Sequence, residues 1–294
     1  MTTVLVVGAS GQVGEHLVAA LADRGADVVG TRFGQDVDGL LQLDFRDDEQ
    51  VDAVLDEVQP DAIVVPAAQP NVDLCERDPE ATYDINVRGT AVLARAAAAR
   101  GLRMVWLSTD YLFDGTSGPY PEMAAALPIQ EYGRQKLMGE HYLLATLPDP
   151  LIVRTNVVYG WERVGKNFVQ RLVKTLSAGE PMRAPVDQFS TPTYAPNLAA
   201  ILAELLERGV TGVVNVSGPD FTDRHTLACA AARAFGLDPD AIARVTTADL
   251  GQDAPRPLNA GLTVDRVRAL VSTEPMSYEE GLATMAATRP AGVQ

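Results

Sequence analysis

The chain has 294 residues, of which 47% are hydrophobic, and its 39 acidic and 24 basic side chains give a net charge of −15. This length fits one large α/β unit or one and a half domains, and the hydrophobic content is sufficient for a substantial core. The negative charge argues against nucleic acid or an anionic membrane surface as a partner. The simplest interpretation of this charge, which we prefer, is that it keeps the protein soluble.

Cysteine and histidine usage gives no sign of a metal site or of an oxidising compartment. Cys75 and Cys229 lie far apart in the chain, and the three histidines lack the spacing of metal ligands. No apolar run approaches the roughly 20 residues that a bilayer span requires, and no charged segment precedes a signal-like apolar stretch. We therefore expect a cytoplasmic protein with no metal site and no membrane attachment.

The first motif lies at a strand-to-helix turn near the start of the chain. Residues 3–7 are apolar and β-branched, as in a strand, and 15–24 have apolar residues at helical spacing. The intervening GASGQVG contains three glycines. One allows a tight turn, one lets the backbone approach a pyrophosphate, and one lets the helix pack closely on the strand. This context favours a dinucleotide site at the helix N-terminus, and a plain βα turn is the alternative. The cofactor-binding residues predicted here are Gly8, Ser10, Gly11, Gln12, Val13 and Gly14.

The next strands are expected to complete the cofactor site. The strand 27–32 ends in Arg32, where NAD-preferring sites commonly have an acid that holds the ribose hydroxyls. Arg32 suits a 2′-phosphate, which favours NADPH over NADH, and a solvated loop arginine is the alternative. A short strand and helix cap over 41–47 place Asp44 and Phe45 at the adenine end.

Strand–helix alternation continues to about residue 216. Strands are predicted at 61–65, 103–107, 151–154 and 213–216, and helices at 48–58, 79–100, 130–145, 167–178 and 197–208. Asn86 and Gly89 are unfavourable inside a helix, so each is expected to have a specific reason. The segment 179–193 reads as a loop with one possible short strand. From residue 223 only small helices are expected, at 223–235, 239–243, 263–270 and 277–288.

A second motif, Tyr132-Gly-Arg-Gln-Lys136, provides chemistry. Positions i and i+4 share one face of a helix, so Tyr132 and Lys136 lie side by side. The lysine charge, with an oxidised nicotinamide nearby, would make the phenol a better acid, able to protonate the alkoxide formed when a ketone accepts hydride. A surface pair is the alternative. The polar strand end Ser108-Thr109 strengthens the catalytic interpretation, because either hydroxyl can donate to the substrate carbonyl.

Together these motifs resemble those of extended short-chain dehydrogenases/reductases. More specifically, STDYLFDG at 108–115, YGxxK at 132–136, DQFxxPT at 187–193 and RPxNxxL at 256–262 resemble the dTDP-4-dehydrorhamnose reductase family over nearly the whole chain. The resemblance implies an α/β, Rossmann-type doubly wound parallel sheet that binds NAD(P)H, with a smaller C-terminal lobe that binds a nucleotide-diphospho-sugar. We expect residues 1–155 and 187–216 in the first unit and 156–186 and 217–294 in the second.

The resemblance also implies a reaction and a set of roles. The family reduces the C4 ketone of a 4-keto-6-deoxy sugar on dTDP, and a homodimer is expected by analogy. The implied catalytic residues are Asn86, Thr109, Tyr132 and Lys136, with Tyr132 as the acid and Lys136 also at the cofactor ribose. Ala67 and Ala68 are expected beside the inner ribose. The implied substrate-binding residues are Ser108, Asp110, Tyr111, Asn167, Phe168, Arg171, Gln188 and Arg256.

The chain departs from the family pattern at several places, which leaves other functions open. Asn156 and Val157 stand where the family has Ser-Trp, Pro66 replaces a polar residue, and Trp161-Glu162-Arg163 adds bulk to a loop. One alternative is a sugar-nucleotide epimerase or dehydratase with bound NAD(P). Another is a non-catalytic nucleotide-binding subunit like the regulatory subunit of methionine adenosyltransferase, against which the intact Thr109, Tyr132 and Lys136 argue.

Overall fold

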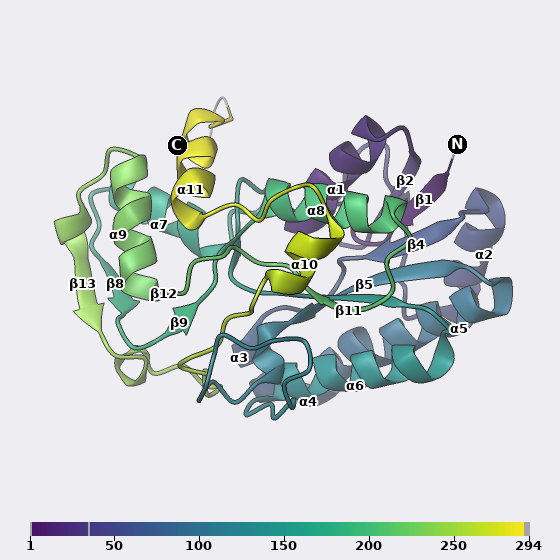
Figure 1. Ribbon diagram of the computed structural model, residues 1–294, viewed down its shortest axis with the longest axis horizontal. Helices are drawn as coiled ribbons and strands as arrows, with labels where there is room; N and C mark the ends of the chain where they lie inside the picture. The colour runs from purple at the N-terminus through teal and green to yellow at the C-terminus, as the bar shows by residue number, and fades with distance from the viewer. Residues whose placement is uncertain (1, 35, 291–294) are drawn as a thin grey trace.

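The centre of the molecule is a parallel sheet with helices on both faces (Figure 1). A computed structural model describes residues 2–34 and 36–290. Within this part, seven strands pair in the order β11-β6-β5-β4-β1-β2-β3, and every pairing is parallel. This is the doubly wound Rossmann order, so the predicted fold class is confirmed. The strands are β1 Thr3–Val6, β2 Asp27–Arg32, β3 Leu41–Gln42, β4 Ala62–Val65, β5 Arg103–Thr109, β6 Leu151–Thr155 and β11 Gly212–Asn215.

Two hydrophobic clusters cover the faces of this sheet. Val4 and Val6 of β1 point into one cluster, and Leu5 points into the other, with all three at most 1% exposed. Burial on both faces explains why these strands are continuously apolar rather than alternating. Helices α1 Gln12–Asp23, α8 Ala195–Glu207 and α10 Asp265–Leu270 cover the first face, and α2 Asp48–Val58, α5 Thr90–Arg100 and α6 Glu131–Thr146 cover the second.

The helix predicted over 79–100 contains a π-helical turn. It consists of α4 Pro79–Tyr83, the π turn Asp84–Gly89 and α5, and it is preceded by a short helix, α3 Val72–Arg77, that was not predicted. Both unfavourable residues now have a reason. Asn86 is 2% exposed and its amide binds the backbone N–H and carbonyl of Gln69. A Cβ at Gly89 would overlap the ring of Phe45, so only glycine lets the helix pack here.

A third hydrophobic cluster belongs to a smaller lobe at one side of the sheet (Figure 1). Its strands form two-stranded pairs: β7 with β10, β9 with β12, and β8 with β13. Their bounds are β7 Val158–Tyr159, β8 Met182–Pro185, β9 Phe189–Ser190, β10 Thr193–Tyr194, β12 Thr222–Asp223 and β13 Ile242–Val245. The lobe also contains α7 Phe168–Ser177, α9 Arg224–Ala234 and α11 Tyr278–Ala287.

Two sequence predictions in this lobe were wrong in detail. The expected helix 239–243 is a single 3₁₀ turn, Pro239–Ala241, and the chain then enters β13. The loop expected at 179–193 contains β8, β9 and the start of β10. These strands are two to four residues long, too short for a periodicity of two to be visible. Residues 1 and 291–294, at the ends of the two predicted units, lie outside the described residues, as does residue 35. Among the described helices, none combines the length and apolarity of a bilayer span.

The π turn gives a stability prediction. In Gly89→Ala the new methyl meets the Phe45 ring, so we expect the free energy of unfolding to fall by about 1–2 kcal/mol, net of the gain in helix propensity. Urea unfolding measures the change. Gly34→Ala is the matched control, because its Cβ position has open space and its stability should not fall. Equal stability of the two variants would contradict the packing role of Gly89.

Candidate active site

The glycine-rich turn forms a cradle at the N-terminus of α1. Gly8 has a φ of +95°, and a Cβ there would lie 2.8 Å from the Ala67 Cβ, while a Cβ on Gly14 would overlap the Gly8 carbonyl. At Gly11, by contrast, a Cβ would meet nothing closer than the Gly8 oxygen at 3.4 Å. No side chain caps this helix, so its first N–H groups remain available to an anion. These features fit a pyrophosphate, as the sequence predicts.

The ends of β2 and β3 hold the residues predicted for the adenine and its ribose. The Arg32 guanidinium pairs with Asp36 at 2.6 Å and donates to Gln42 at 2.6 Å, but its buried Nε has no partner among the described residues. Asp44 forms a bidentate ion pair with Arg46, which lowers the pKa of the Asp44 carboxyl. Phe45 is 9% exposed and belongs to the core beneath Gly89.

Asn86 connects three parts of the site. Besides Gln69, in the loop that follows β4, its amide donates to the Gln135 side chain on α6 at 2.9 Å. The loop is thereby fixed to the helix that carries Tyr132 and Lys136. Ala67 and Ala68 lie near the start of this loop, after Pro66, and both are partly buried.

The polar end of β5 lies against α6. Thr109 caps a 3₁₀ turn, Asp110–Leu112, by accepting from the Tyr111 N–H, and its own hydroxyl lies 3.3 Å from Asp110. The rings of Tyr111 and Tyr132 meet edge to face, with centroids 6.1 Å apart. The buried Ser108 hydroxyl has no partner among the described residues. The structure thus brings together Thr109, Tyr111 and Tyr132, as predicted.

Burial controls the charges of Tyr132 and Lys136. It raises the pKa of the Tyr132 phenol far above its usual value, and a hydrogen bond with Thr109 offsets only part of this rise. Burial also lowers the pKa of Lys136 to about 7, against a smaller opposing effect of Glu140. That Lys136 and an oxidised nicotinamide make the phenol more acidic stays a prediction, while burial and the charges of Cys75, Asp110 and Tyr111 raise the phenol pKa. The phenol is therefore held protonated, as a proton donor must be.

Asp110 is the centre of a buried polar network. Its Oδ2 accepts from Asn156 at 3.0 Å and from the Gly261 N–H at 3.4 Å. Asn156 in turn accepts from the Thr191 hydroxyl at 3.3 Å. Burial raises the pKa of Asp110 to about 6, with the hydrogen bond from Asn156 as the largest opposing effect. Asn156, a departure from the family pattern, therefore bonds directly to a predicted substrate residue.

Three arginines act on one another beside this network. Burial lowers the pKa of Arg224, the first residue of α9, and the charges of Arg171 and Arg256 lower it further. Arg256 pairs with Asp73 at 2.9 Å, but within the described residues no carboxylate pairs with Arg171 or Arg224. The Arg224 guanidinium lies 4.9 Å from the ring centroid of Phe168. A dianion would relieve this repulsion between cations.

Comparisons with known proteins agree with this geometry. The protein-family model described as the RmlD substrate binding domain matches residues 1–289. The chain belongs to this family. The probable low-salt glycan biosynthesis reductase Agl14 of Haloferax volcanii is 35% identical over 291 residues, 96% of each chain. A crystal structure of dTDP-4-dehydrorhamnose reductase from Bacillus anthracis in complex with NADP superposes with a TM-score of 0.88 at 28% identity, over 97% of this chain and 98% of that one.

Membership in the RmlD family confirms the predicted family and the predicted class, an NAD(P)H-dependent oxidoreductase. One relative represents another kind of function. Methionine adenosyltransferase 2 subunit beta of Danio rerio is 30% identical over 287 residues, 95% of this chain and 88% of that protein.

The structure places the other predicted substrate residues unequally. Phe168 lies beneath Arg224, and the Gln188 carbonyl accepts from the Arg224 backbone N–H. Asn167 caps α7 and binds Gly160 and Glu162, so its side chain is already used by the fold, and a substrate role for it stays a prediction. Arg224 itself was missed. A single arginine at a helix start is common on surfaces, and nothing in the sequence distinguishes it.

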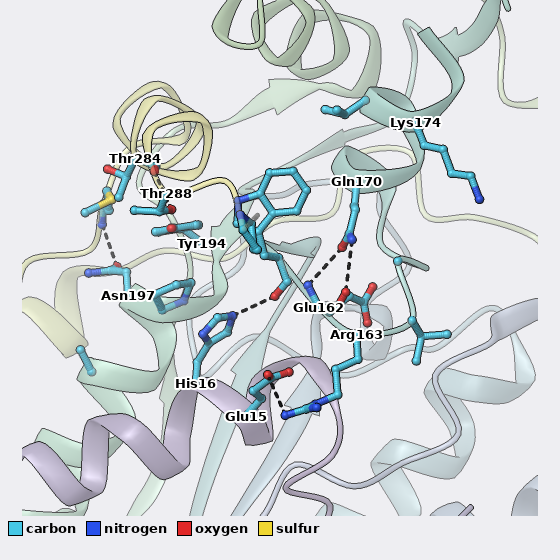
Figure 2. Close-up of a pocket in the computed structure, with 18 residues that line it drawn as sticks. Glu15, His16, Glu162, Arg163, Gln170, Lys174, Tyr194, Asn197, Thr284 and Thr288 are labelled. Carbon is cyan, nitrogen blue, oxygen red and sulfur yellow. Dashed lines mark hydrogen bonds and ion pairs between the residues drawn. The ribbon is translucent and has the colours of Figure 1, made fainter. Parts of the chain in front are cut away.

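A cavity of about 990 Å³ lies apart from this site (Figure 2). It is enclosed by α1, α7, α8, α11 and the loop 161–165, and none of the predicted site residues lines it. The loop is tied to α1 through His16, which bonds the Trp161 carbonyl, and through the Glu15–Arg163 ion pair (Figure 2). Among residues 2–34 and 36–290, no group of three or more histidine, cysteine or acidic side chains is arranged to hold a metal ion.

The Asp110 network gives a pH-dependent prediction. Because burial raises the folded-state pKa to about 6, above the usual value of 3.8, the unfolded chain ionises first as pH rises. The carboxylate therefore costs stability progressively between about pH 4 and 6, and the full cost is present above pH 6. Asp110→Asn removes this cost and keeps an oxygen for Asn156. We expect the variant to gain about 2 kcal/mol relative to the native protein between pH 4.5 and 7.5. Urea unfolding at both pH values measures the difference.

The exposed Asp38→Asn serves as the control and should not change with pH relative to the native protein. If the free energies of unfolding of Asp110→Asn and the native protein change in parallel over this pH range, ionisation of Asp110 does not destabilise the folded protein.

Proposed function

We propose that the protein uses NADPH to reduce the C4 ketone of a nucleotide-diphospho-4-keto-6-deoxy sugar, as a dTDP-4-dehydrorhamnose reductase does. The proposal rests on Tyr132, a buried phenol that lies beside Thr109, and on Arg224, which lies close to Asp110 and Tyr111 and has no carboxylate partner among the described residues. The first group suits a developing alkoxide and the second a diphosphate. The nucleotide, the sugar and its product stereochemistry belong to this proposal.

The cofactor would lie over the glycine-rich turn. The pyrophosphate would be held by the residues of this turn: Gly8, Ser10, Gly11, Gln12, Val13 and Gly14. Ala67 and Ala68 would lie beside the inner ribose. Arg32, whose buried Nε has no partner among the described residues, supports a 2′-phosphate and hence NADPH. Asp44 and Phe45 keep their proposed place near the adenine. When bound, the cofactor supplies the hydride that the reaction needs.

Tyr132 would deliver the proton that completes the reduction. Its phenol lies within hydrogen-bond reach of the Thr109 hydroxyl, and both would donate to the carbonyl oxygen of the substrate. As negative charge develops on that oxygen, the proton moves from the Tyr132 oxygen to it. Lys136, charged over part of the neutral range, would stabilise the resulting tyrosinate and bind the cofactor ribose. Asn86 would hold the loop after β4 against α6 and so keep this geometry.

The smaller lobe would hold the nucleotide diphosphate. The charges of Arg171 and Arg256 act on Arg224, so the three arginines would together meet a dianion; Arg224 also contacts Phe168 and donates its backbone N–H to the Gln188 carbonyl. Ser108, Asp110 and Tyr111 would contact the sugar, with the Ser108 hydroxyl free to bond. We keep residues 156–186 and 217–294 as the substrate lobe in this proposal, with α10 assigned instead to the central sheet and β9 and β10 to the lobe, and a homodimer as the assembly.

A regulatory subunit is the second candidate, because of the 30% identity with methionine adenosyltransferase 2 subunit beta of Danio rerio. Turnover separates the two. The reductase proposal requires that NADPH absorbance fall only when a dTDP-4-keto-6-deoxy sugar is added. Tight NADPH binding without turnover, whichever configuration the sugar has at C3 and C5, would favour the regulatory role.

Replacement of the acid should stop turnover without loss of the cofactor. In Tyr132→Phe only the phenol oxygen is removed, so we expect the rate to fall about 10²–10⁴-fold. NADPH affinity, followed by nicotinamide fluorescence, should stay within a few-fold of the native value. Tyr83→Phe, at a ring that is 44% exposed, is the control and should keep full activity. A native rate in Tyr132→Phe would exclude Tyr132 as the acid.

Replacement of Arg224 should weaken the sugar nucleotide alone. A charged hydrogen bond to phosphate contributes roughly 1.5–3 kcal/mol, so Arg224→Gln should lower kcat/KM for the sugar nucleotide about 10–100-fold. The Kd of NADPH should not change. Arg233→Gln, at an exposed arginine of the same helix, should have no effect on either constant. An increased Kd for NADPH in Arg224→Gln would place this arginine at the cofactor instead.

A further inference from the structure

Lys136 is a buried cation without an acidic partner. Its side chain is 2% exposed, and within the described residues no carboxylate pairs with it. Glu140, one helical turn further along α6, is bound on both oxygens by Arg154, at 2.9 and 2.6 Å. Instead, the Lys136 Nζ lies 3.5 Å from the ring centroid of Trp106. The aromatic face of Trp106 therefore occupies the place that an anion would normally take.

The fold makes room for this indole. Trp106 lies on β5, three residues before Thr109, and is 1% exposed. Above it α6 carries Gly139, where a Cβ would lie only 2.7 Å from the Cη2 atom of the indole. The buried Trp106 N–H has no partner among the described residues, so hydrogen bonding does not explain the choice of tryptophan. What the position does supply is the ring face that meets Lys136.

We propose that Trp106 is a positioning residue for Lys136, whose ammonium it holds by its ring face without using up the N–H donors that the cofactor ribose needs. A carboxylate in the same place would bind those donors and cancel the positive charge near Tyr132. The indole attracts the cation through its quadrupole and carries no net charge, so the field of Lys136 at the phenol is kept. This proposal rests on the proposed catalytic role of Lys136.

Few titratable groups act on Lys136. They are Glu140 on its own helix and Cys75 on α3, and both favour the charged form of the lysine. Burial raises the pKa of the Cys75 thiol, which is therefore neutral near pH 7. Glu140 and Cys75 are unchanged in every variant below, so any difference between variants reports on the ring.

The first test uses the protein without substrate or cofactor. The chain has two tryptophans, so Trp161→Phe leaves Trp106 as the only indole. We expect its fluorescence to change between pH 5 and 10 with a midpoint near the Lys136 pKa of about 7, and the change to vanish when Lys136→Met is added. Emission that is constant with pH, or that still changes without Lys136, would overturn the proposal. Trp161→Tyr replaces Trp161→Phe if that variant does not fold.

The second test follows the alkaline limb of NADPH oxidation. Loss of the ring face destabilises charged Lys136, so in Trp106→Leu the limb should move to lower pH by about one unit, and in Trp106→Phe by less. The KM of NADPH should rise in the same order. Met104→Ala, in the same strand and core cluster, is the control: it leaves a cavity but should keep the native limb. An unmoved limb in Trp106→Leu would overturn the proposal.

The two tests separate this proposal from the proposed function. If no sugar nucleotide is reduced, the proposed function fails, and the fluorescence titration still decides whether Trp106 holds Lys136.

Discussion

A parallel strand that is buried on both faces can place polar side chains only at its ends, and this constraint arranges the whole site. The interior of β5 is apolar from Met104 to Leu107, and its polar side chains lie at its ends, Arg103 at the start and Ser108 and Thr109 at the carboxyl end. The glycine turn after β1, the small residues after β4 and the polar end of β5 therefore meet at one edge of the sheet. Polar and reactive side chains are concentrated at this edge because the buried faces of the sheet accept only apolar ones.

This constraint also explains what the sequence could predict. All seven strands of the large sheet were expected close to their observed bounds, since an apolar run between turn signals leaves few alternatives. The Tyr132–Lys136 pair was equally readable, because a spacing of four on a helix fixes which side chains are neighbours. Asn86 and Gly89 stood out as misfits within a helix, and the structure gives both a contact that requires them.

The remaining features depend on contacts between segments far apart in the chain, which leave no local pattern. The π turn exists because Phe45 and Gln69, from two different loops, meet one helix. Arg224 stands out because the charges of Arg171 and Arg256, from other segments, act on it. Trp106 stands out because it packs against Gly139 of α6. The short strands of the smaller lobe pair β8 with β13 across more than fifty residues, so neither strand is recognisable alone.

The departures from the family pattern divide into two groups in the structure. Trp161 packs its ring against Phe235 and donates to the Met285 carbonyl, whereas Arg163 pairs with Glu15 of α1, so this loop joins the smaller lobe to a helix of the central sheet. Asn156 and Val157 directly follow β6. Asn156 bonds Asp110, and Val157 has a φ of +39°, a strained conformation for a β-branched residue that costs about 1–3 kcal/mol. Such strain persists only where neighbours fix the backbone, here through the Thr193 N–H bond to the Val157 carbonyl. Under the proposed function, Thr109, Tyr132 and Lys136 would carry the chemistry of the family, and the strained backbone after β6 is where a difference in sugar preference would arise.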